Sequence, residues 1–271
     1  IPMKNLIILV TGASSGIGRA TAERFAKQGH LVFGTSRKAR FEKPINPTSV
    51  NMIPMETTDE KSVKTAVDFV LQQTGRLDLL VNCAGFGIAG SIEGVPVSEA
   101  KKQFDVNFFG TLTVIQSVLP LFRTAGTGQI INIGSVAGYI PIPFQSMYSA
   151  SKFALESLTE TLAMETRKFG IKVSLVEPGD TKTGFTASRI MSADKHIEEN
   201  YMPESRKAIA QMEKDEENGC PPDNVARVVC RIAGKKRPPV RVTVGFAYKL
   251  IYGFSRILPT KLKLFVLKLI Y

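Results

Sequence analysis

The stretch that decides the fold is LIILVTGASSGIG, residues 6–18. Its first five residues are apolar, which is the length and composition of a short buried strand. Glycines follow at positions 12, 16 and 18, and the sequence from there is compatible with a helix over residues 16–28. Where a strand turns through glycines into a helix, the free N–H groups and positive dipole end of the helix attract phosphate. The stretch therefore predicts a dinucleotide-binding turn.

Each glycine has its own expected role in this turn. Gly12 permits the tight bend, Gly16 lets the backbone approach a pyrophosphate, and Gly18 allows the helix to pack closely on the strand. The spacing Gly-x-x-x-Gly-x-Gly is one residue longer than the common dinucleotide fingerprint. Further cofactor contacts are expected from Ser14, Ser15 and Ile17.

Short apolar runs alternate with longer helical stretches along the rest of the chain, as is typical of βαβ units around a parallel sheet. Strands are predicted over residues 6–10, 31–35, 50–55, 78–82, 129–133, 172–177 and 240–244. Helices are predicted over residues 16–28, 59–73, 97–123, 147–168 and 222–233. The sequence therefore predicts an α/β fold with a doubly wound, Rossmann-type parallel sheet of about seven strands.

No repeat or linker divides the chain, so we expect one dinucleotide-binding domain over residues 1–247. Residues 180–220 interrupt the alternation with a long polar stretch, and a connection of this length is usually functional. We expect a lid there, and a pair of surface helices is the alternative. Residues 248–271 are expected to form a C-terminal extension of the same domain.

Composition narrows the classes of function. Hydrophobic residues make up 44% of the chain, which is ordinary for a folded globular protein. The three cysteines are far apart and the two histidines lack partners at ligand spacing, so neither a disulfide framework nor a metal site is expected. No secretion signal is recognisable, and the default expectation is a cytoplasmic protein without a nucleic-acid partner.

The end of the second predicted strand indicates which dinucleotide is bound. Residues 31–35 are followed by Ser36 and Arg37, where a protein that binds NAD carries an acid for the ribose 2′-hydroxyl. A guanidinium can bind a 2′-phosphate through two hydrogen bonds, whereas a carboxylate repels it. We therefore expect NADP(H), contacted by Ser36 and Arg37, and a solvated basic loop is the alternative.

Polar residues with catalytic potential lie after the other predicted strands. Tyr148 and Lys152 are one helical turn apart and share a face of the helix. Ser135 follows a predicted strand, at the edge where sheets of this kind bind ligands. Residues 82–85, which read Asn-Cys-Ala-Gly, end another strand, and Asn107 lies within a helical stretch.

These landmarks, in this order, resemble the short-chain dehydrogenase/reductase family over roughly residues 5–245, and its hydroxysteroid and retinol dehydrogenase branch in particular. The resemblance implies a catalytic tetrad of Ser135, Tyr148, Lys152 and Asn107. Tyr148 would exchange a proton with the substrate oxygen, and Ser135 would hold that oxygen. Because a free phenol titrates near pH ~10, Lys152 would lower the pKa of Tyr148, and it would also contact the ribose. Asn107 would support a water molecule.

The resemblance also implies further cofactor contacts. The nicotinamide carboxamide is expected at Pro178, Gly179, Thr181 and Thr183. The adenosine side is expected at Asn82 and Ala84, with Gly85 beside them. Glu56 stands where many family members have an aspartate that contacts adenine, and its extra methylene is a departure from the pattern.

The walls of the site are expected to be apolar, from Phe86, Ile88, Val136, Tyr139, Ile140, Phe144, Met147, Phe185 and Met191. Such a pocket suits a small apolar carbonyl or secondary alcohol, lipid-like or steroid-like. Two alternatives stay open: a reductase of acyl-carrier or phosphorylated substrates docked by the basic tail, and an NADP-binding sensor or scaffold without catalysis. A serine hydrolase does not fit, because Ser135 is not set in Gly-x-Ser-x-Gly.

The net charge of +11 arises entirely from the end of the chain, since residues 224–271 contain eleven basic residues and no acidic one. This asymmetry indicates an anionic partner. Residues 248–271 mix basic with apolar residues, and Pro259 interrupts any continuous helix, so we expect peripheral binding to an anionic membrane surface. Subunit packing is the alternative, and by analogy with the family we expect a homo-oligomer, a dimer or tetramer.

Overall fold

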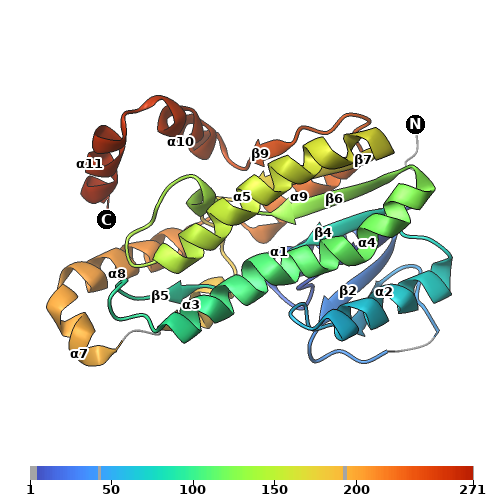
Figure 1. Cartoon of the computed structure of the whole chain (residues 1–271), viewed down its shortest axis with the longest axis horizontal. Coiled ribbons are helices and arrows are strands. Elements are labelled where there is room, and N and C mark those ends of the chain that lie inside the picture. Colours follow the sequence, from blue (N-terminus) through green and yellow to red (C-terminus); the bar gives the residue numbers. More distant parts are fainter. Residues whose placement is uncertain (1–4, 42–43, 192–193, 271) are drawn as a thin grey trace.

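The computed structural model describes residues 5–41, 44–191 and 194–270. Its centre is a seven-stranded parallel sheet with the strand order β3-β2-β1-β4-β6-β7-β9 (Figure 1). The strands are β1 (Ile7–Val10), β2 (Leu31–Ser36), β3 (Val50–Pro54), β4 (Leu79–Asn82), β6 (Gly128–Ile133), β7 (Ile171–Glu177) and β9 (Arg241–Thr243). All seven predicted strands are present, each end within one residue of its predicted position. The predicted doubly wound parallel sheet is therefore confirmed.

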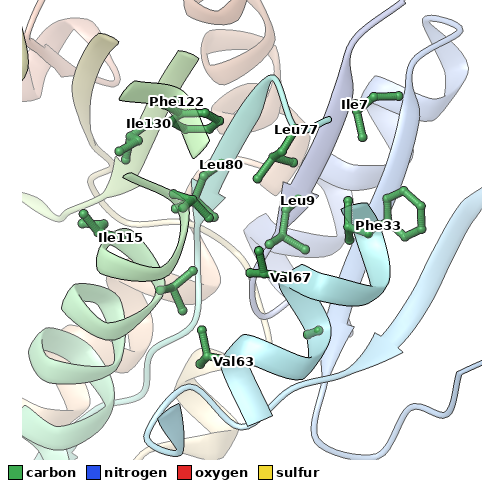
Figure 2. Close-up of a cluster of buried hydrophobic side chains, with 14 of the residues drawn as sticks. Ile7, Leu9, Phe33, Val63, Val67, Leu77, Leu80, Ile115, Phe122 and Ile130 are labelled. Atoms are coloured by element: carbon green, nitrogen blue, oxygen red, sulfur yellow. The ribbon is translucent and has the colours of Figure 1, made fainter. Parts of the chain in front are cut away.

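Helices cover both faces of this sheet. One face carries α2 (Glu60–Thr74), α4 (Thr111–Ala125) and α5 (Ser146–Thr166). The other face carries α1 (Gly16–Lys27) and α9 (Pro222–Ala233). Figure 2 shows the first of these interfaces, where Leu9, Phe33 and Leu80 of the sheet are fully buried beneath the helices. Burial of each such side chain stabilises the fold by roughly 1.5–3 kcal/mol.

Local signals set the ends of α2. The Asp59 side chain accepts a hydrogen bond from the Lys61 N–H at 2.9 Å and so caps the first turn. Gly75 ends the helix in the left-handed conformation, with φ at 73°. The helix bounds are therefore local properties of the sequence.

The strand order reverses between β1 and β4, because the chain runs outward to β3 on one side and to β9 on the other. At such a switch point the loops after neighbouring strands diverge and leave a crevice at the carboxyl edge of the sheet. The glycine turn follows β1, and residues 83–87 follow β4. Both segments therefore border this crevice.

The predicted lid is a small, mainly helical subdomain at the same edge of the sheet (Figure 1). It contains α6 (Phe185–Ser188), β8 (Ile190–Met191), α7 (Lys195–Glu198), the 3-10 turn η4 (Glu199–Tyr201) and α8 (Glu204–Glu217). β8 pairs in parallel with β5 (Ile88–Ala89), and these two-residue strands are too short to be recognised from periodicity. The segment is thus anchored on the loop after β4, and its role as a lid stays a prediction.

Residues 97–125 form one continuous helix made of α3 (Val97–Phe104), the π-helical turn η1 (Asp105–Gly110) and α4. By length and composition, this helix is the one in the described chain that could cross a membrane. Its α4 portion buries Val114, Val118 and Phe122 in the core against the sheet.

The C-terminal extension consists of α10 (Phe246–Ile257) and α11 (Thr260–Ile270). As predicted, Pro259 separates two helices, and the first begins at residue 246, two residues before the predicted start. Figure 1 shows both helices beyond β9, at the same end of the molecule as the lid. Among the side chains of α11 that are described, Leu267 alone is buried.

Candidate active site

The glycine turn forms a cradle that side chains would fill. Gly12 and Gly16 have φ angles of 65° and 52°, which favour glycine. A Cβ at Gly12 would lie 2.9 Å from the Ala84 Cα, and a Cβ at Gly18 would overlap the Gly12 carbonyl oxygen. The turn therefore keeps its backbone bare at the N-terminus of α1, which is the shape and electrostatics that a pyrophosphate requires.

The loop after β4 is held against this turn. Thr11 Oγ1 accepts hydrogen bonds from the N–H groups of Cys83 and Ala84, at 3.0 and 3.1 Å. The buried Asn82 donates through Nδ2 to Asn132 Oδ1 at 2.9 Å, so its side chain lies beneath the loop. The outer side of the glycine turn carries the exposed Ser14 and Ser15 and the half-buried Ile17.

Ser135, Tyr148 and Lys152 come together at the carboxyl end of β6. Ser135 follows this strand, and its side chain is near enough to that of Tyr148 to lower the Tyr148 pKa. Lys152 lies one turn further along α5, with Nζ 5.8 Å from the Tyr148 ring centroid, and it donates to the Ile133 carbonyl oxygen at 2.9 Å. Lys152 is only 6% exposed. Two hydroxyls beside a buried ammonium can hold an oxygen atom and exchange a proton with it.

Asn107 connects the loop after β4 to α5. It is 1% exposed and lies in the π-helical turn η1, a distortion that is frequent at functional sites. Its Oδ1 accepts from the Phe86 N–H at 3.0 Å, and its Nδ2 donates to the Phe86 carbonyl at 3.0 Å and to Ser151 Oγ at 3.2 Å. A Cβ at Gly85 would lie 3.1 Å from the same Oδ1. Asn107 therefore positions this loop next to Lys152, and its support of a water molecule stays a prediction.

The pKa values at this site follow from burial. Burial raises the pKa of Tyr148 to about 12, against the lowering effect of the nearby Ser135 side chain. Burial also lowers the pKa of Lys152 to about 8. The expectation of a lowered Tyr148 pKa is therefore wrong in this structure, because desolvation of the phenolate outweighs nearby charges. At neutral pH the pair is a protonated phenol beside an ammonium.

Side chains of the lid cover Tyr148. The Phe185 ring centroid lies 5.3 Å from that of Tyr148. The Arg189 side chain is 1% exposed, pairs with Glu216 of α8 and has its guanidinium carbon 6.0 Å from the Phe185 ring centroid. After burial and Ser135, the next influences on the Tyr148 pKa are Glu216, which raises it, and Arg189, which lowers it. Sequence reasoning missed this ion pair, since no spacing marks its members among the many charges of the lid.

Several residues of the predicted apolar walls pack against other elements. Tyr139 and Ile140 pack with Leu267 of α11, so they support the extension. Met191 is 60% exposed on β8, and Ile88 is buried within β5. These contacts give Tyr139, Ile140 and Ile88 a structural role, and their place in the walls of the site stays a prediction.

The end of β2 carries the residues expected to select the dinucleotide. Its position is set by the glycine turn, since the Ala13 N–H donates to the Thr35 carbonyl at 3.0 Å. The Arg37 side chain is 79% exposed, and its Nε lies 4.0 Å from Glu56 Oε2. Ser36 Oγ accepts from the backbone N–H of the second residue after it, at 3.3 Å. Arg37 and Glu56 are thus neighbours. The charge of each would therefore affect a ligand that binds to the other.

The loop after β7 lies between the Ser135 segment and the glycine turn and contacts both. The Pro178 carbonyl accepts from the Val136 N–H at 2.9 Å, next to Ser135. The Thr181 hydroxyl donates to the Gly179 carbonyl at 2.9 Å. Thr183 lies over the glycine turn: a Cβ added at Gly16 would be 3.4 Å from the Thr183 Cβ. In the described ranges no three histidine, cysteine or acidic side chains gather in a way that could hold a metal ion.

The site and the fold match known proteins. A sequence profile of the family described as short chain dehydrogenase matches residues 6–193. The chain is 41% identical over 270 residues to 3-ketodihydrosphingosine reductase of Bacteroides thetaiotaomicron, covering 99% of each chain. It is 32% identical to NADPH-dependent 3-dehydrocapnine reductase of Ornithobacterium rhinotracheale, over 88% of this chain and 87% of that protein. It is 30% identical to retinol dehydrogenase 8 of Bos taurus, over 89% and 82%.

A solved structure agrees with these relatives. A short-chain dehydrogenase from Streptomyces avermitilis superposes with a TM-score of 0.81 at 30% identity, covering 95% of this chain and 94% of that one. The profile spans more than half of the chain, and the relatives span nearly all of it. The chain therefore belongs to the short-chain dehydrogenase family of oxidoreductases.

Proposed function

We propose that this protein is an NADP(H)-dependent oxidoreductase acting on the carbonyl or secondary alcohol of an apolar, lipid-like substrate. The observation that carries the proposal is the meeting of Ser135, Tyr148 and Lys152 beside a bare glycine turn. The nicotinamide, when bound, would supply or accept the hydride. A sensor or scaffold without catalysis would have no use for this complete set of groups.

Tyr148 is the proton donor for reduction in this proposal. With a pKa of about 12, its phenol is protonated at neutral pH and can protonate the oxygen that becomes negative as the hydride arrives. Ser135 hydrogen-bonds the same oxygen. The Lys152 ammonium stabilises the phenolate that is left behind, and it would also hold the ribose of the cofactor. Asn107 positions the loop beside Lys152.

Arg37 supports the choice of NADP(H). It is exposed at the end of β2, where it can turn toward a 2′-phosphate and form a charge-assisted hydrogen bond. One relative is named as NADPH-dependent. The Glu56 carboxylate 4.0 Å from Arg37 would oppose the phosphate, so we infer that Arg37 leaves Glu56 when the cofactor binds.

Two observations favour a lipid-like substrate. Phe185 places an apolar ring beside Tyr148, and relatives are named for a ketodihydrosphingosine and for retinol. Docking of an acyl carrier by the basic tail has less support, since Arg241 and Arg256 already pair with acidic residues of the domain. We therefore infer a long-chain ketone or alcohol.

A substrate panel tests this proposal. Purified protein is mixed with NADPH and with a long-chain 3-ketone, a retinal or a ketosteroid, and NADPH absorbance is followed. We expect oxidation of NADPH with the long-chain ketone, and a far slower oxidation when Tyr148→Phe replaces the wild type. Consumption of NADPH that is equal in both proteins would show that the site described here does not carry the reaction.

We also propose that the extension lies on an anionic membrane surface. Its helices expose Phe246, Leu250, Phe254, Ile257, Leu262, Leu264, Phe265 and Leu269. The exposed Lys249, Lys261 and Lys268 lie between these apolar residues in the sequence. Apolar side chains insert shallowly at the lipid boundary, and each basic residue near anionic lipid adds about 1 kcal/mol. A lipid-dissolved substrate would then reach the site from the same surface.

Vesicle co-sedimentation tests the membrane proposal. We expect binding to phosphatidylcholine vesicles that contain phosphatidylserine, and much weaker binding to vesicles without it. The double variant Phe254→Ser, Ile257→Ser should release the protein, whereas Ile92→Ser, at a loop residue that is 72% exposed, should not. Wild-type binding that is absent, or unaffected by the double variant, would favour subunit packing instead.

The outer faces of η1 and α5 suit a contact between copies of the chain. Phe109, Phe153 and Met164 are 51%, 41% and 72% exposed there. We propose a homo-oligomer through this surface. Light scattering should give a multiple of the 29.6 kDa chain mass, and Met164→Glu should lower it. A monomeric wild type would contradict the proposal.

A further inference from the structure

A tyrosine of the extension packs directly on the loop after β7. The Tyr248 hydroxyl donates to the Asp180 carboxylate and accepts from the Asp180 N–H at 3.2 Å. A Cβ at Gly179 would overlap the Tyr248 ring. Gly179 is not among the described glycines with positive φ, so the backbone conformation does not demand glycine there. Glycine is needed at residue 179 because a side chain there would overlap the Tyr248 ring.

The inner face of α10 holds this ring in place. The Tyr248 carbonyl accepts from the Tyr139 hydroxyl at 3.2 Å. One turn on, the Tyr252 ring packs edge-on against Tyr139, with the ring centroids 5.1 Å apart. The guanidinium carbons of Arg241 and Arg256 lie 4.8 and 5.3 Å from the Tyr252 centroid. Tyr248, Tyr252 and Arg256 recur every four residues and so share one face of the helix. The apolar residues of the opposite face remain exposed.

The loop that Tyr248 contacts borders both parts of the site. Pro178 is bonded to the Ser135 segment through the Val136 N–H. The Asp180 carbonyl accepts from the Cys220 N–H at 3.0 Å, which ties the loop to the start of α9. Thr183 then lies over the glycine turn. A shift of residues 179 and 180 would therefore move the polar groups between Ser135 and the phosphate cradle.

We propose that Tyr248 is a positioning residue for the nicotinamide half of the cofactor. Its ring on Gly179 and its hydroxyl on Asp180 set the loop of residues 178–181, and that loop in turn receives the nicotinamide. This inference rests on the proposed function, because it takes this loop as the place where the nicotinamide binds. The packing of α10 on this loop thus affects binding of the nicotinamide half of the cofactor. It does not affect binding of the adenosine half.

Calorimetric binding of two ligands tests the inference. The ligands are NADPH and 2′-phospho-ADP-ribose, which lacks only the nicotinamide. We expect Tyr248→Leu to weaken NADPH about tenfold, the scale of a hydrogen bond to a charged group, while 2′-phospho-ADP-ribose binds as it does to the wild type. Tyr248→Phe keeps the ring and loses the hydroxyl, so it should fall between wild type and Tyr248→Leu.

Two controls make the result specific. Phe254→Leu changes an exposed residue of the same helix and should alter neither affinity. Asp180→Ala removes the partner of the hydroxyl, so combining it with Tyr248→Phe should add little to either change alone. Equal weakening of both ligands, or unchanged NADPH affinity in Tyr248→Leu and Tyr248→Phe alike, would overturn the inference.

The same titrations separate this inference from the proposed function. NADH and ADP-ribose form the matching pair without the 2′-phosphate. If the wild type prefers NADH, the NADP(H) proposal fails. The inference would still be supported if Tyr248→Leu weakened binding of NADH and left binding of ADP-ribose unchanged. If the wild type binds neither dinucleotide, both the proposed function and the inference are wrong.

Discussion

The proposed catalytic centre and the C-terminal extension both contact helix α5, by different kinds of contact. Lys152 reaches the centre from within the helix and bonds to the backbone of β6. The extension contacts α5 through Arg256, which pairs with Glu156, and it contacts the segment before α5 through Tyr252, which packs on Tyr139. The first attachment is buried and short in sequence, whereas the second joins residues about a hundred positions apart.

The ion pairs of the basic tail reduce the number of its basic residues that are free to bind an external anion. Its charge looks like an excess when counted along the chain, yet Arg241 pairs with Glu177 and Glu156, and Arg256 pairs with Glu156. These two arginines are counter-ions for buried carboxylates and are not free for an external anion. Within α10 and α11, the proposed membrane contact would therefore rely on the exposed Lys249, Lys261 and Lys268.

The largest expected effect separates chemistry from attachment. Tyr148→Phe removes the proposed proton donor and keeps the ring that packs on Phe185. We expect turnover to fall by about 10²–10⁴-fold, the range of general acid catalysis, with NADPH affinity unchanged. Steady-state kinetics and calorimetry measure the two quantities. Tyr201→Phe, whose hydroxyl bonds to Glu93, is the matched control. Retention of a large part of the activity would remove Tyr148 from the reaction.

The second effect compares two arginines of the tail. The Arg241 side chain is 12% exposed and faces Glu177, which is 1% exposed, whereas Arg256 is 51% exposed. Arg241→Gln leaves a buried carboxylate uncompensated, and we expect a loss of about 3–5 kcal/mol in the free energy of unfolding. Arg256→Gln should cost less than about 1 kcal/mol, because water screens that pair. Urea unfolding measures both. Similar losses would show that the two attachments are alike.

A third effect tests selection at the far end of the cofactor. Arg37→Ala should weaken NADPH by about 1.5–3 kcal/mol and leave NADH nearly unchanged, since only NADPH carries the 2′-phosphate. Lys38→Ala, one residue further on, is the control. Glu56→Gln removes the carboxylate 4.0 Å from Arg37 and should tighten NADPH slightly. Equal losses for both dinucleotides in Arg37→Ala would argue against a role in selection.

The smallest effect is one of pH. Burial lowers the pKa of Lys152 to about 8, so its ammonium is present below that pH and is lost above it. Tyr148, with a pKa of about 12, stays protonated over this range. We expect kcat/KM for reduction to be level below pH 8 and to fall about tenfold per pH unit above it. Lys152→Arg keeps its charge and should abolish this fall in its residual activity. A level wild-type profile would contradict the assignment.

The parts of the molecule that were predictable share one property. The glycine turn, the Tyr148–Lys152 pair and Ser135 are each defined by a short spacing or by their place at a strand end. A parallel sheet then brings those ends together. Asp59 is likewise a local cap. Residues along one element, or at neighbouring strand ends, can therefore be assembled from the sequence.

The parts that were missed depend on long-range packing. Arg189 and Glu216 meet within the lid, and β5 pairs with β8 across some hundred residues. The packing of Tyr139 against Leu267 and Tyr252 of the extension was likewise not foreseen. The direction of the Tyr148 pKa was wrong for the same reason, because the burial that raises it is a property of the folded lid and domain.

The contact between Gly179 and the Tyr248 ring has a consequence for how relatives of this chain can vary. The ring fits only because residue 179 has no side chain, so the two positions complement each other in volume. We expect a lineage that enlarges residue 179 to shrink residue 248 or to lose the extension, and one that keeps the extension to keep both. The length of the C-terminus and the identity of a single loop glycine would then be inherited together.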